Sequence, residues 1–146
     1  MQTTVKQILA GKEVNELWTI EPEATIYQAL ELMAEKNIGA LPVLENDKLV
    51  GIFSERDYAR NIPFTYESAE KCTVREIMTK DVLGVKPENT TQQCMFLMTE
   101  KRIRHLPVIE EGNIIGIVTT GDIGKQIISD QQVMINHLEY YITQVP

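Results

Sequence analysis

Two short stretches of the chain pair a hydroxyl with a carboxylate at a spacing that can do chemistry. Ser54 precedes Asp57 by three residues, and Thr119 precedes Asp122 in the same way. Each pair follows an apolar run and opens a helix-like segment. A Ser or Thr followed three residues later by an acidic residue satisfies free backbone N–H groups at a helix start. The same Asp can also accept hydrogen bonds from paired hydroxyls, as acidic residues do with the ribose of dinucleotides.

Neighbouring residues favour a ligand in addition to a helix cap. Gly121 takes the place of Arg56, and glycine within a helix costs about 1 kcal/mol relative to alanine. Glycine is useful where another molecule approaches the backbone closely. A helix start also offers N–H groups and partial positive charge to phosphate, and Arg60 and Lys125 can each add a full charge one turn later. Arg56 either pairs with a neighbouring carboxylate or contacts such an anion. We therefore expect a ligand site at one motif at least.

The motifs recur because the chain contains a tandem duplication. Residues 21–60 and 86–125 align without a gap, whereas VKQIL at Val5–Leu9 echoes VREIM at Val74–Met78 in a different register. The predicted boundaries are 1–61 for the first repeat with its N-terminal leading segment, 62–71 for a connector, 72–128 for the second repeat and 129–146 for a C-terminal helix.

Each repeat predicts the same order of elements. Thr25–Lys36 carries apolar residues at helical spacing. The apolar runs Leu41–Leu44 and Leu49–Phe53 flank a polar turn and predict a hairpin. Short extended segments at Glu13–Ile20 and Asp81–Val85 lead in, and a helix from about Ser54 closes the unit. The predicted fold class is α/β (α+β), with two β-α-β-β-α repeats packed sheet to sheet about a pseudo-twofold axis and a further C-terminal helix.

Composition and charge exclude several classes of function. The chain has 146 residues and a net charge of −7, which argues against a nucleic-acid partner because phosphate backbones require clustered basic residues. It has no apolar run of membrane-spanning length and no signal-peptide core, so we expect a cytoplasmic protein without membrane contact. Cys72 and Cys94 have no metal-binding spacing. We expect Cys94 to be a core residue, whereas Cys72, beside the connector, could be exposed.

No catalytic machinery is evident in the sequence. His105 has no serine, cysteine or carboxylate placed to form a triad. The chain also lacks the GxxxxGK[ST] loop typical of nucleotide hydrolysis. We therefore expect a protein that is not an enzyme and that uses no catalytic cofactor or metal.

The two copies resemble CBS domains, the paired modules first described in cystathionine beta-synthase. The residues that carry the resemblance are Gly39–Val43 with Gly51–Asp57, and Arg104–Val108 with Gly116–Asp122. The VREIMT segment and the DQQ…LEYYI tail are similar to those of stand-alone bacterial CBS pairs.

The resemblance implies clefts between the repeats that bind an adenosine-containing ligand such as AMP, ATP, NAD or S-adenosylmethionine. In the family, the hydroxyl and Asp of each motif hold ribose, the backbone before each proline reads adenine, and the extended segments close over it. Arg104-His105, in place of Gly39-Ala40, favours a phosphorylated ligand or narrows the second pocket. With the charged and glycine positions above, the expected ligand-binding residues are Thr19, Ile38, Gly39, Ala40, Pro42, Ser54, Arg56, Asp57, Arg60, Thr79, Val82, Arg104, His105, Pro107, Thr119, Gly121, Asp122 and Lys125.

The last segment carries an apolar stripe that something must cover. Met134, Leu138, Tyr141 and Val145 follow helical spacing, and either the chain's own domain or a partner subunit packs on them. Phe96, on the polar side of its helix, favours a subunit. CBS pairs resemble one another in dimerising through these helices, so we expect a homodimer.

These observations predict a regulatory module that binds an adenine nucleotide and acts as an energy or redox-state sensor in signal transduction. An unknown effector protein would read its state. The alternative is a dimeric protein-interaction adaptor without a physiological nucleotide.

Overall fold

The computed structural model describes residues 2–12, 17–61 and 69–144, which fall into two compact units. The first-repeat unit takes in the described residues of 16–84 together with 111–115. The second-repeat unit takes in those of 1–15, 85–110 and 116–146. Within the described ranges, no helix is both long and apolar enough to cross a membrane.

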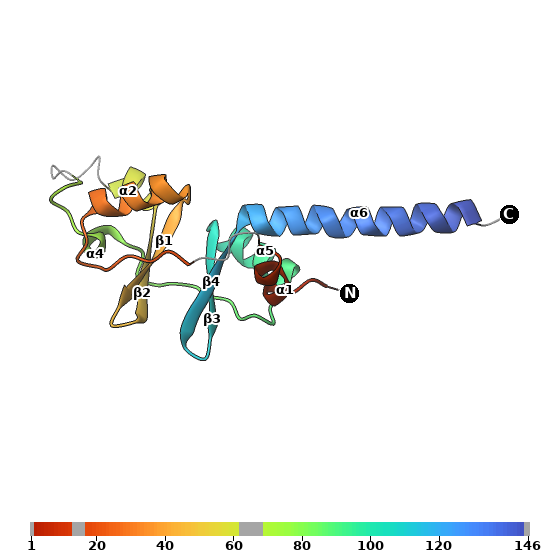
Figure 1. Cartoon of the computed structure of the whole chain (residues 1–146), viewed down its shortest axis with the longest axis horizontal. Helices are drawn as coiled ribbons and strands as arrows, with labels where there is room; N and C mark the ends of the chain where they lie inside the picture. Colours follow the sequence, from red (N-terminus) through yellow and green to blue (C-terminus); the bar gives the residue numbers. More distant parts are fainter. Residues whose placement is uncertain (1, 13–16, 62–68, 145–146) are drawn as a thin grey trace. The chain divides into compact units, whose positions relative to one another are not determined.

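The first-repeat unit is a β-hairpin with helices packed on it (Figure 1). β1 (Ala40–Glu45) and β2 (Lys48–Ser54) pair antiparallel, with an irregularity after Val43. The helices are α2 (Ile26–Lys36), α3 (Glu55–Asn61) and α4 (Val74–Ile77). Fully buried side chains from α2, both strands and α4 form one apolar core: Ile26, Ala29, Leu41, Val43, Phe53 and Val74.

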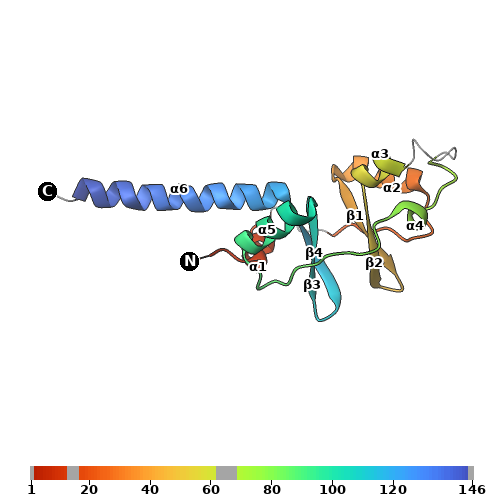
Figure 2. The same ribbon diagram turned by 180° about the vertical axis from the view of Figure 1, so that it is seen from behind.

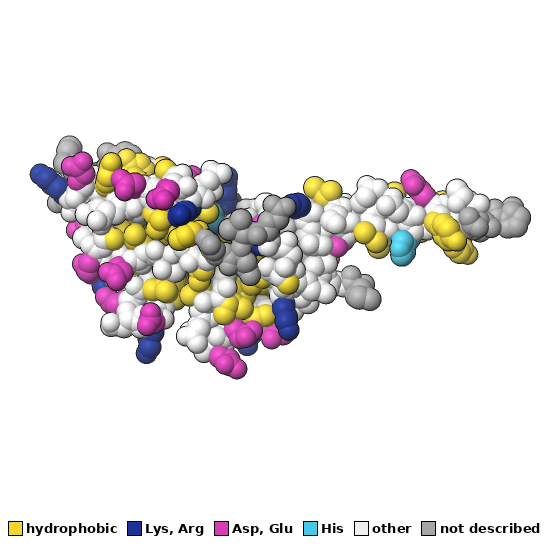
Figure 3. All heavy atoms as spheres, in the orientation of Figure 1, with side chains coloured by type: hydrophobic (Ala, Val, Ile, Leu, Met, Phe, Trp, Pro, Cys, Tyr) yellow, Lys and Arg dark blue, Asp and Glu magenta, His cyan; other side chains and the backbone are white. Residues whose placement is uncertain are grey.

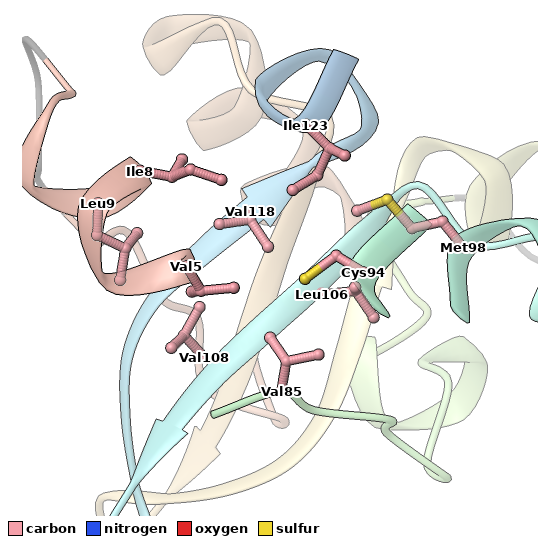
Figure 4. Packing of buried hydrophobic residues seen from close by; sticks show 10 residues of the cluster. All are labelled: Val5, Ile8, Leu9, Val85, Cys94, Met98, Leu106, Val108, Val118 and Ile123. Atoms are coloured by element: carbon pink, nitrogen blue, oxygen red, sulfur yellow. The ribbon is translucent and has the colours of Figure 1, made fainter. Parts of the chain in front are cut away.

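The second-repeat unit repeats this arrangement (Figure 2). β3 (His105–Glu110) and β4 (Asn113–Thr119) pair as a two-stranded sheet, of which β3 and residues 116–119 of β4 belong to this unit. Its helices are α1 (Val5–Ala10), α5 (Thr91–Lys101) and α6 (Thr120–Gln144). Figure 4 shows how side chains from all five elements, and Val85, converge on one core: Val5, Ile8, Leu9, Val85, Cys94, Met98, Leu106, Val108, Val118 and Ile123.

The same caps fix the first helix of each repeat. In α2 the Gln28 N–H donates to Oγ1 of Thr25 at 3.1 Å, and the Thr25 N–H donates to Oε1 of Gln28 at 2.9 Å. Thr90 and Gln93 make the same reciprocal pair at the start of α5. Both threonines were expected to begin a helix. The predicted helix at Thr25–Lys36 and the predicted hairpins are confirmed, and with them the two-repeat α/β fold.

Each leading helix packs in the unit of the other repeat. The Val5 N–H donates to Asn89 O at 2.8 Å, and the Val74 N–H donates to Ala24 O at 2.8 Å. The structure therefore differs from the sequence-based grouping, in which 1–61 and 72–128 each included their own leading segment. The physical reason is burial, because the apolar faces of α1 and α4 complete the cores of the second and first repeats respectively.

The predicted leading strands are reduced to single bridges. Ile20 pairs in parallel with Val43, and Val85 with Val108. Pro22 and Pro87 follow two residues later, and a proline cannot donate to a sheet ladder. Residues 13–16 of the predicted Glu13–Ile20 segment lie outside the described residues.

The C-terminal helix begins earlier than predicted. Ser129 or Asp130 was expected to cap a separate helix, but α6 runs unbroken from Thr120 and projects beyond the rest of its unit (Figure 1). The carboxylate of Asp130 has other partners, because it accepts from the Thr3 hydroxyl at 2.9 Å and from the Gln126 amide at 2.9 Å. The predicted C-terminal helix is therefore the continuation of a longer helix that begins at Thr120.

Both cysteines are buried. Cys94 is fully buried in the second core, as expected, and this burial raises the pKa of its thiol. Cys72 is only 3% exposed and lies in the first core. The exposure that the sequence left open for Cys72 does not occur, because this residue packs in the first core just before α4.

Two glycines allow a test of this packing. A Cβ at Gly51 would lie 2.7 Å from Sδ of Met78 and 2.8 Å from the Thr79 carbonyl oxygen, whereas one at Gly124 meets nothing within 4 Å. We expect Gly51→Ala to lower the free energy of unfolding by about 1–3 kcal/mol. Gly124→Ala, within α6, should raise it by about 1 kcal/mol. Urea unfolding measures both, and equal effects would contradict the close approach at Gly51.

Candidate functional site

The first motif lies where β2 passes into α3. The Ser54 N–H donates to Oδ2 of Asp57 at 2.9 Å, and the Asp57 N–H donates to Oγ of Ser54 at 3.2 Å. The Ser54 hydroxyl also donates to Oδ2 at 3.0 Å. The pair is therefore a reciprocal helix cap, and its carboxylate is held in one orientation.

The second motif has the same geometry where β4 passes into α6. The Thr119 N–H donates to Oδ2 of Asp122 at 2.9 Å, and the Asp122 N–H donates to Oγ1 of Thr119 at 3.1 Å. Both motifs thus perform the structural role that the sequence allowed for. A ligand role would be added to the cap and would not replace it.

The backbone that precedes Pro42 and Pro107 lies beside the motif of each unit. The Glu55 N–H donates to Gly39 O at 3.0 Å in the first unit. The Thr120 N–H donates to Arg104 O at 3.0 Å in the second. Ala40 is also the β1 residue opposite Ser54. The segments expected to read adenine and the motifs expected to hold ribose are therefore neighbours within each unit.

Thr79 completes the first motif. Its hydroxyl donates to Oδ1 of Asp57 at 3.0 Å. Its backbone forms an antiparallel bridge with Ile52, in which the Thr79 N–H donates to Ile52 O at 2.8 Å. The structure thus brings Thr79, which the family resemblance placed at the site, into direct contact with the motif carboxylate.

Lys12 completes the second motif, and the sequence analysis missed it. Its ammonium lies 2.9 Å from Oδ2 of Asp122 and donates to Ile117 O at 2.8 Å. Both side chains of this ion pair are about a quarter exposed, at 26% and 27%. One sequence signal could have pointed to Lys12. The VKQIL and VREIM segments align in a different register from the rest of the repeats. The residues that follow these two segments therefore differ between the repeats and have to be considered separately.

The remaining expected site residues are dispersed over the two units. In the described part of the chain, no group of three or more metal-ligating side chains occurs. These residues differ in exposure. Pro42 and Pro107 are buried, and Thr19, Ile38, Val82 and His105 are half-buried. The exposed ones lie on the closing helices: Arg56, Arg60, Gly121 and Lys125.

Comparison with known proteins places this geometry in a family. Residues 5–63 and 74–129 each match the CBS domain. The chain belongs to the CBS-domain family. It is 34% identical over 148 residues to the CBS domain-containing protein CBSX3, mitochondrial, of Arabidopsis thaliana, covering 96% of this chain and 72% of that protein.

Solved CBS structures share the fold. The crystal structure of the CBS domain protein NE2398 has a TM-score of 0.84 and 41% identity, covering 88% of this chain and 99% of that one. The CBS domain pair of protein MJ0100 was solved in complex with 5′-methylthioadenosine and S-adenosyl-L-methionine. It has a TM-score of 0.77 and 27% identity, covering 89% of this chain and 99% of that one. The tandem CBS pair and its fold are therefore established for this chain.

The cap at the first motif makes a prediction about stability. Ser54→Ala removes the hydroxyl that accepts from Asp57 N–H, and losing such a cap costs about 1 kcal/mol. Ser129→Ala makes the same chemical change at an exposed position inside α6 and should cost nothing. Thermal unfolding of both variants measures the difference. A Ser54→Ala chain as stable as the Ser129→Ala chain would contradict the cap.

Proposed function

We propose that this CBS pair is a regulatory module that binds an adenosine-containing ligand at its two Ser/Thr-x-x-Asp motifs. The observation that carries the proposal is the repeated juxtaposition of a capping motif, whose carboxylate is fixed, with the backbone that precedes a proline. Glu55, inside the Ser54–Asp57 motif, donates to Gly39 O, and Thr120, inside the Thr119–Asp122 motif, donates to Arg104 O. An adenosine has a matching pair of features, a ribose diol and a base with hydrogen-bonding edges.

The motif carboxylates retain acceptor capacity for ribose hydroxyls. An ionised carboxylate offers about four lone-pair positions. At Asp122, the donors within the described structure, Thr119 N–H and Lys12, both reach Oδ2. At Asp57, two donors reach Oδ2 and one, the Thr79 hydroxyl, reaches Oδ1. Capping therefore leaves positions on Oδ1 at which a ribose hydroxyl can donate.

Gly121 supports close approach of a ligand at the second motif. A Cβ there would lie 3.6 Å from Oγ1 of Thr119, which is an ordinary contact distance. The fold therefore tolerates a side chain at this position, although alanine would suit the helix better. Room for a ligand beside the Thr119 hydroxyl is a physical reason for glycine.

The regulatory part of the proposal follows from the duplication and the relatives. A complex of a similar CBS pair with 5′-methylthioadenosine and S-adenosyl-L-methionine supports an adenosyl ligand. A ligand with different affinities for two arrangements of the chain would shift their populations. An effector protein would read that shift, so the module would report energy or redox state without catalysing a reaction.

Binding is testable by thermal unfolding with AMP, ADP, ATP, NAD, NADH and S-adenosylmethionine at millimolar concentration. A ligand present at about 100 times its Kd stabilises the folded chain by roughly 2.7 kcal/mol. We expect a clear rise in Tm with at least one of them. The rise should be reduced in Asp57→Ala or Asp122→Ala, according to which motif binds.

The matched control is Asp47→Ala, which removes a carboxylate from an exposed turn of the β1–β2 hairpin. It should leave the ligand-induced rise unchanged. No rise with any of the six compounds would favour the alternative function, a dimeric interaction adaptor without a physiological nucleotide.

We further propose that α6 mediates homodimerisation. Large apolar side chains on its projecting part are 46–70% exposed, among them Ile128, Ile135, Leu138 and Ile142. Figure 3 shows apolar side chains along this part of the helix. Phe96 on α5 is 64% exposed, in line with its expected place at an interface. Of the predicted stripe, Met134, Leu138 and Tyr141 are exposed, and Val145 lies outside the described residues.

The spacing of these residues suits a second copy of the helix. Ile128, Ile135 and Ile142 recur every seven residues, and Leu138 lies between the last two. With isoleucine at a and leucine at d, this is the heptad pattern of two-stranded coiled coils. Gln131, at the d position between Ile128 and Ile135, adds a polar group to the seam. A polar group in such a seam helps to fix the register of the two helices.

A charge in the seam should therefore break the dimer. Leu138→Lys places an ammonium at a d position, and we expect it to convert the dimer to monomer in sedimentation equilibrium. Asn136→Lys adds the same charge two residues away, off the seam, and should leave the mass unchanged. A dimer that survives Leu138→Lys, or a wild-type monomer, would contradict this interface.

A further inference from the structure

Thr79 at the first motif and Lys12 at the second donate hydrogen bonds to equivalent acceptors, but Thr79 is neutral and Lys12 is a cation. At the first motif, Thr79 uses two donors: its N–H to the carbonyl of Ile52 and its hydroxyl to Asp57. At the second motif, the single ammonium of Lys12 bonds both to the carbonyl of Ile117 and to Asp122. Ile52 and Ile117 are equivalent positions in the aligned repeats. A neutral group therefore faces one motif carboxylate and a cation faces the other.

The backbone explains why a lysine is needed at the second motif. α4 ends at Ile77, and the chain then extends so that Thr79 pairs directly with β2. α1 continues to Ala10 and is capped by Gly11, whose N–H bonds back to the helix. The long side chain of Lys12 spans from this segment to Ile117 O and Asp122.

The ammonium also has capacity left for a ligand. A lysine ammonium carries three N–H donors and no acceptor. In the described structure, Lys12 directs two of them to Ile117 O and Asp122 Oδ2. Both contacts leave Oδ1 of Asp122 open to ribose, so a nucleoside and Lys12 can occupy the motif together. The third N–H, on a flexible stem, is then available to an anionic group attached to that nucleoside.

We propose that Lys12 is the specificity-determining residue of the second motif and selects phosphorylated adenosine ligands over uncharged ones. The inference rests on the proposed function and deepens it. A phosphate gains a charge-assisted hydrogen bond from the ammonium, whereas adenosine gains nothing there. Arg104 adds a second positive charge near this motif, because its carbonyl accepts from Thr120 N–H and its side chain is exposed.

Isothermal titration calorimetry with adenosine and adenosine 5′-monophosphate tests this inference. The full chain carries Asp57→Ala, so that binding reports on the second motif. We expect AMP to bind at least about tenfold more tightly than adenosine, the scale of one hydrogen bond to a charged group. Adding Lys12→Met, which keeps the stem and removes the charge, should bring the two Kd values within about twofold by weakening AMP alone.

Three further variants keep the result interpretable. Lys12→Gln retains a donor without the charge and should behave as Lys12→Met. If one of these two variants fails to fold, the other still tests the effect of removing the charge. Lys12→Arg restores the charge and should restore the preference for AMP. Lys6→Met removes the same charge from an exposed position on α1 and should change neither Kd.

The possible failures are distinguishable. Equal loss of affinity for AMP and adenosine in Lys12→Met and Lys12→Gln would mean that Lys12 only positions Asp122, which overturns the inference and leaves the proposed function standing. Binding by the wild-type chain but not by the Asp57→Ala chain would assign the ligand to the first motif, with the same consequence. Absence of binding by the wild-type chain to either compound would overturn both.

Discussion

Each half of this molecule depends on one constraint: a leading segment lies very close to a glycine on a sheet strand. Gly51 on β2 and Gly116 on β4 occupy equivalent positions, and a Cβ at either would come within 3 Å of the segment packed against it. At Gly51 that segment is Met78-Thr79, and at Gly116 it is Leu9 on α1. Because neither glycine has a side chain of its own, the leading segment can lie close to the strand, with Thr79 or Lys12 at the motif carboxylate. In each unit, the core contact at the glycine, the helix cap and the candidate ligand site are therefore adjacent to one another.

The same carboxylate therefore has two roles that are physically coupled. Asp57 and Asp122 satisfy backbone N–H groups at the starts of α3 and α6, so their orientation is fixed by the fold. An acceptor held in this way binds a hydroxyl without first losing rotamer freedom. Any ligand that changes the bonding of Asp122 also acts on the first turn of α6. The chemistry at the motif and the position of a long helix are then linked through one residue.

Much of this arrangement was predictable from the sequence because it depends on local patterns. Thr25 and Thr90 begin helices as their capping residues indicate, and the alternation of apolar runs with a polar turn gave both hairpins. The features that escaped prediction depend on tertiary contacts. The position of α1 in the second-repeat unit rests on core burial, and Lys12 reaches its partners across more than a hundred residues of sequence. Asp130 reads as a helix cap in sequence, yet in the structure it bonds to Thr3 and Gln126 within a continuous helix.

The packing of α1 has a consequence for the order in which the chain can acquire its structure during synthesis. Residues 2–12 leave the ribosome before their partners on β3, β4, α5 and α6, which lie between Val85 and Ile123. The first-repeat core, from Ile26 to Met78, is complete well before those residues are made, and domains generally fold as units during synthesis. The apolar face of α1 therefore has no native partner until most of the chain has been synthesised. The two repeats, although alike in sequence, therefore differ in when their cores can be completed, because the second core requires residues as late as Ile123.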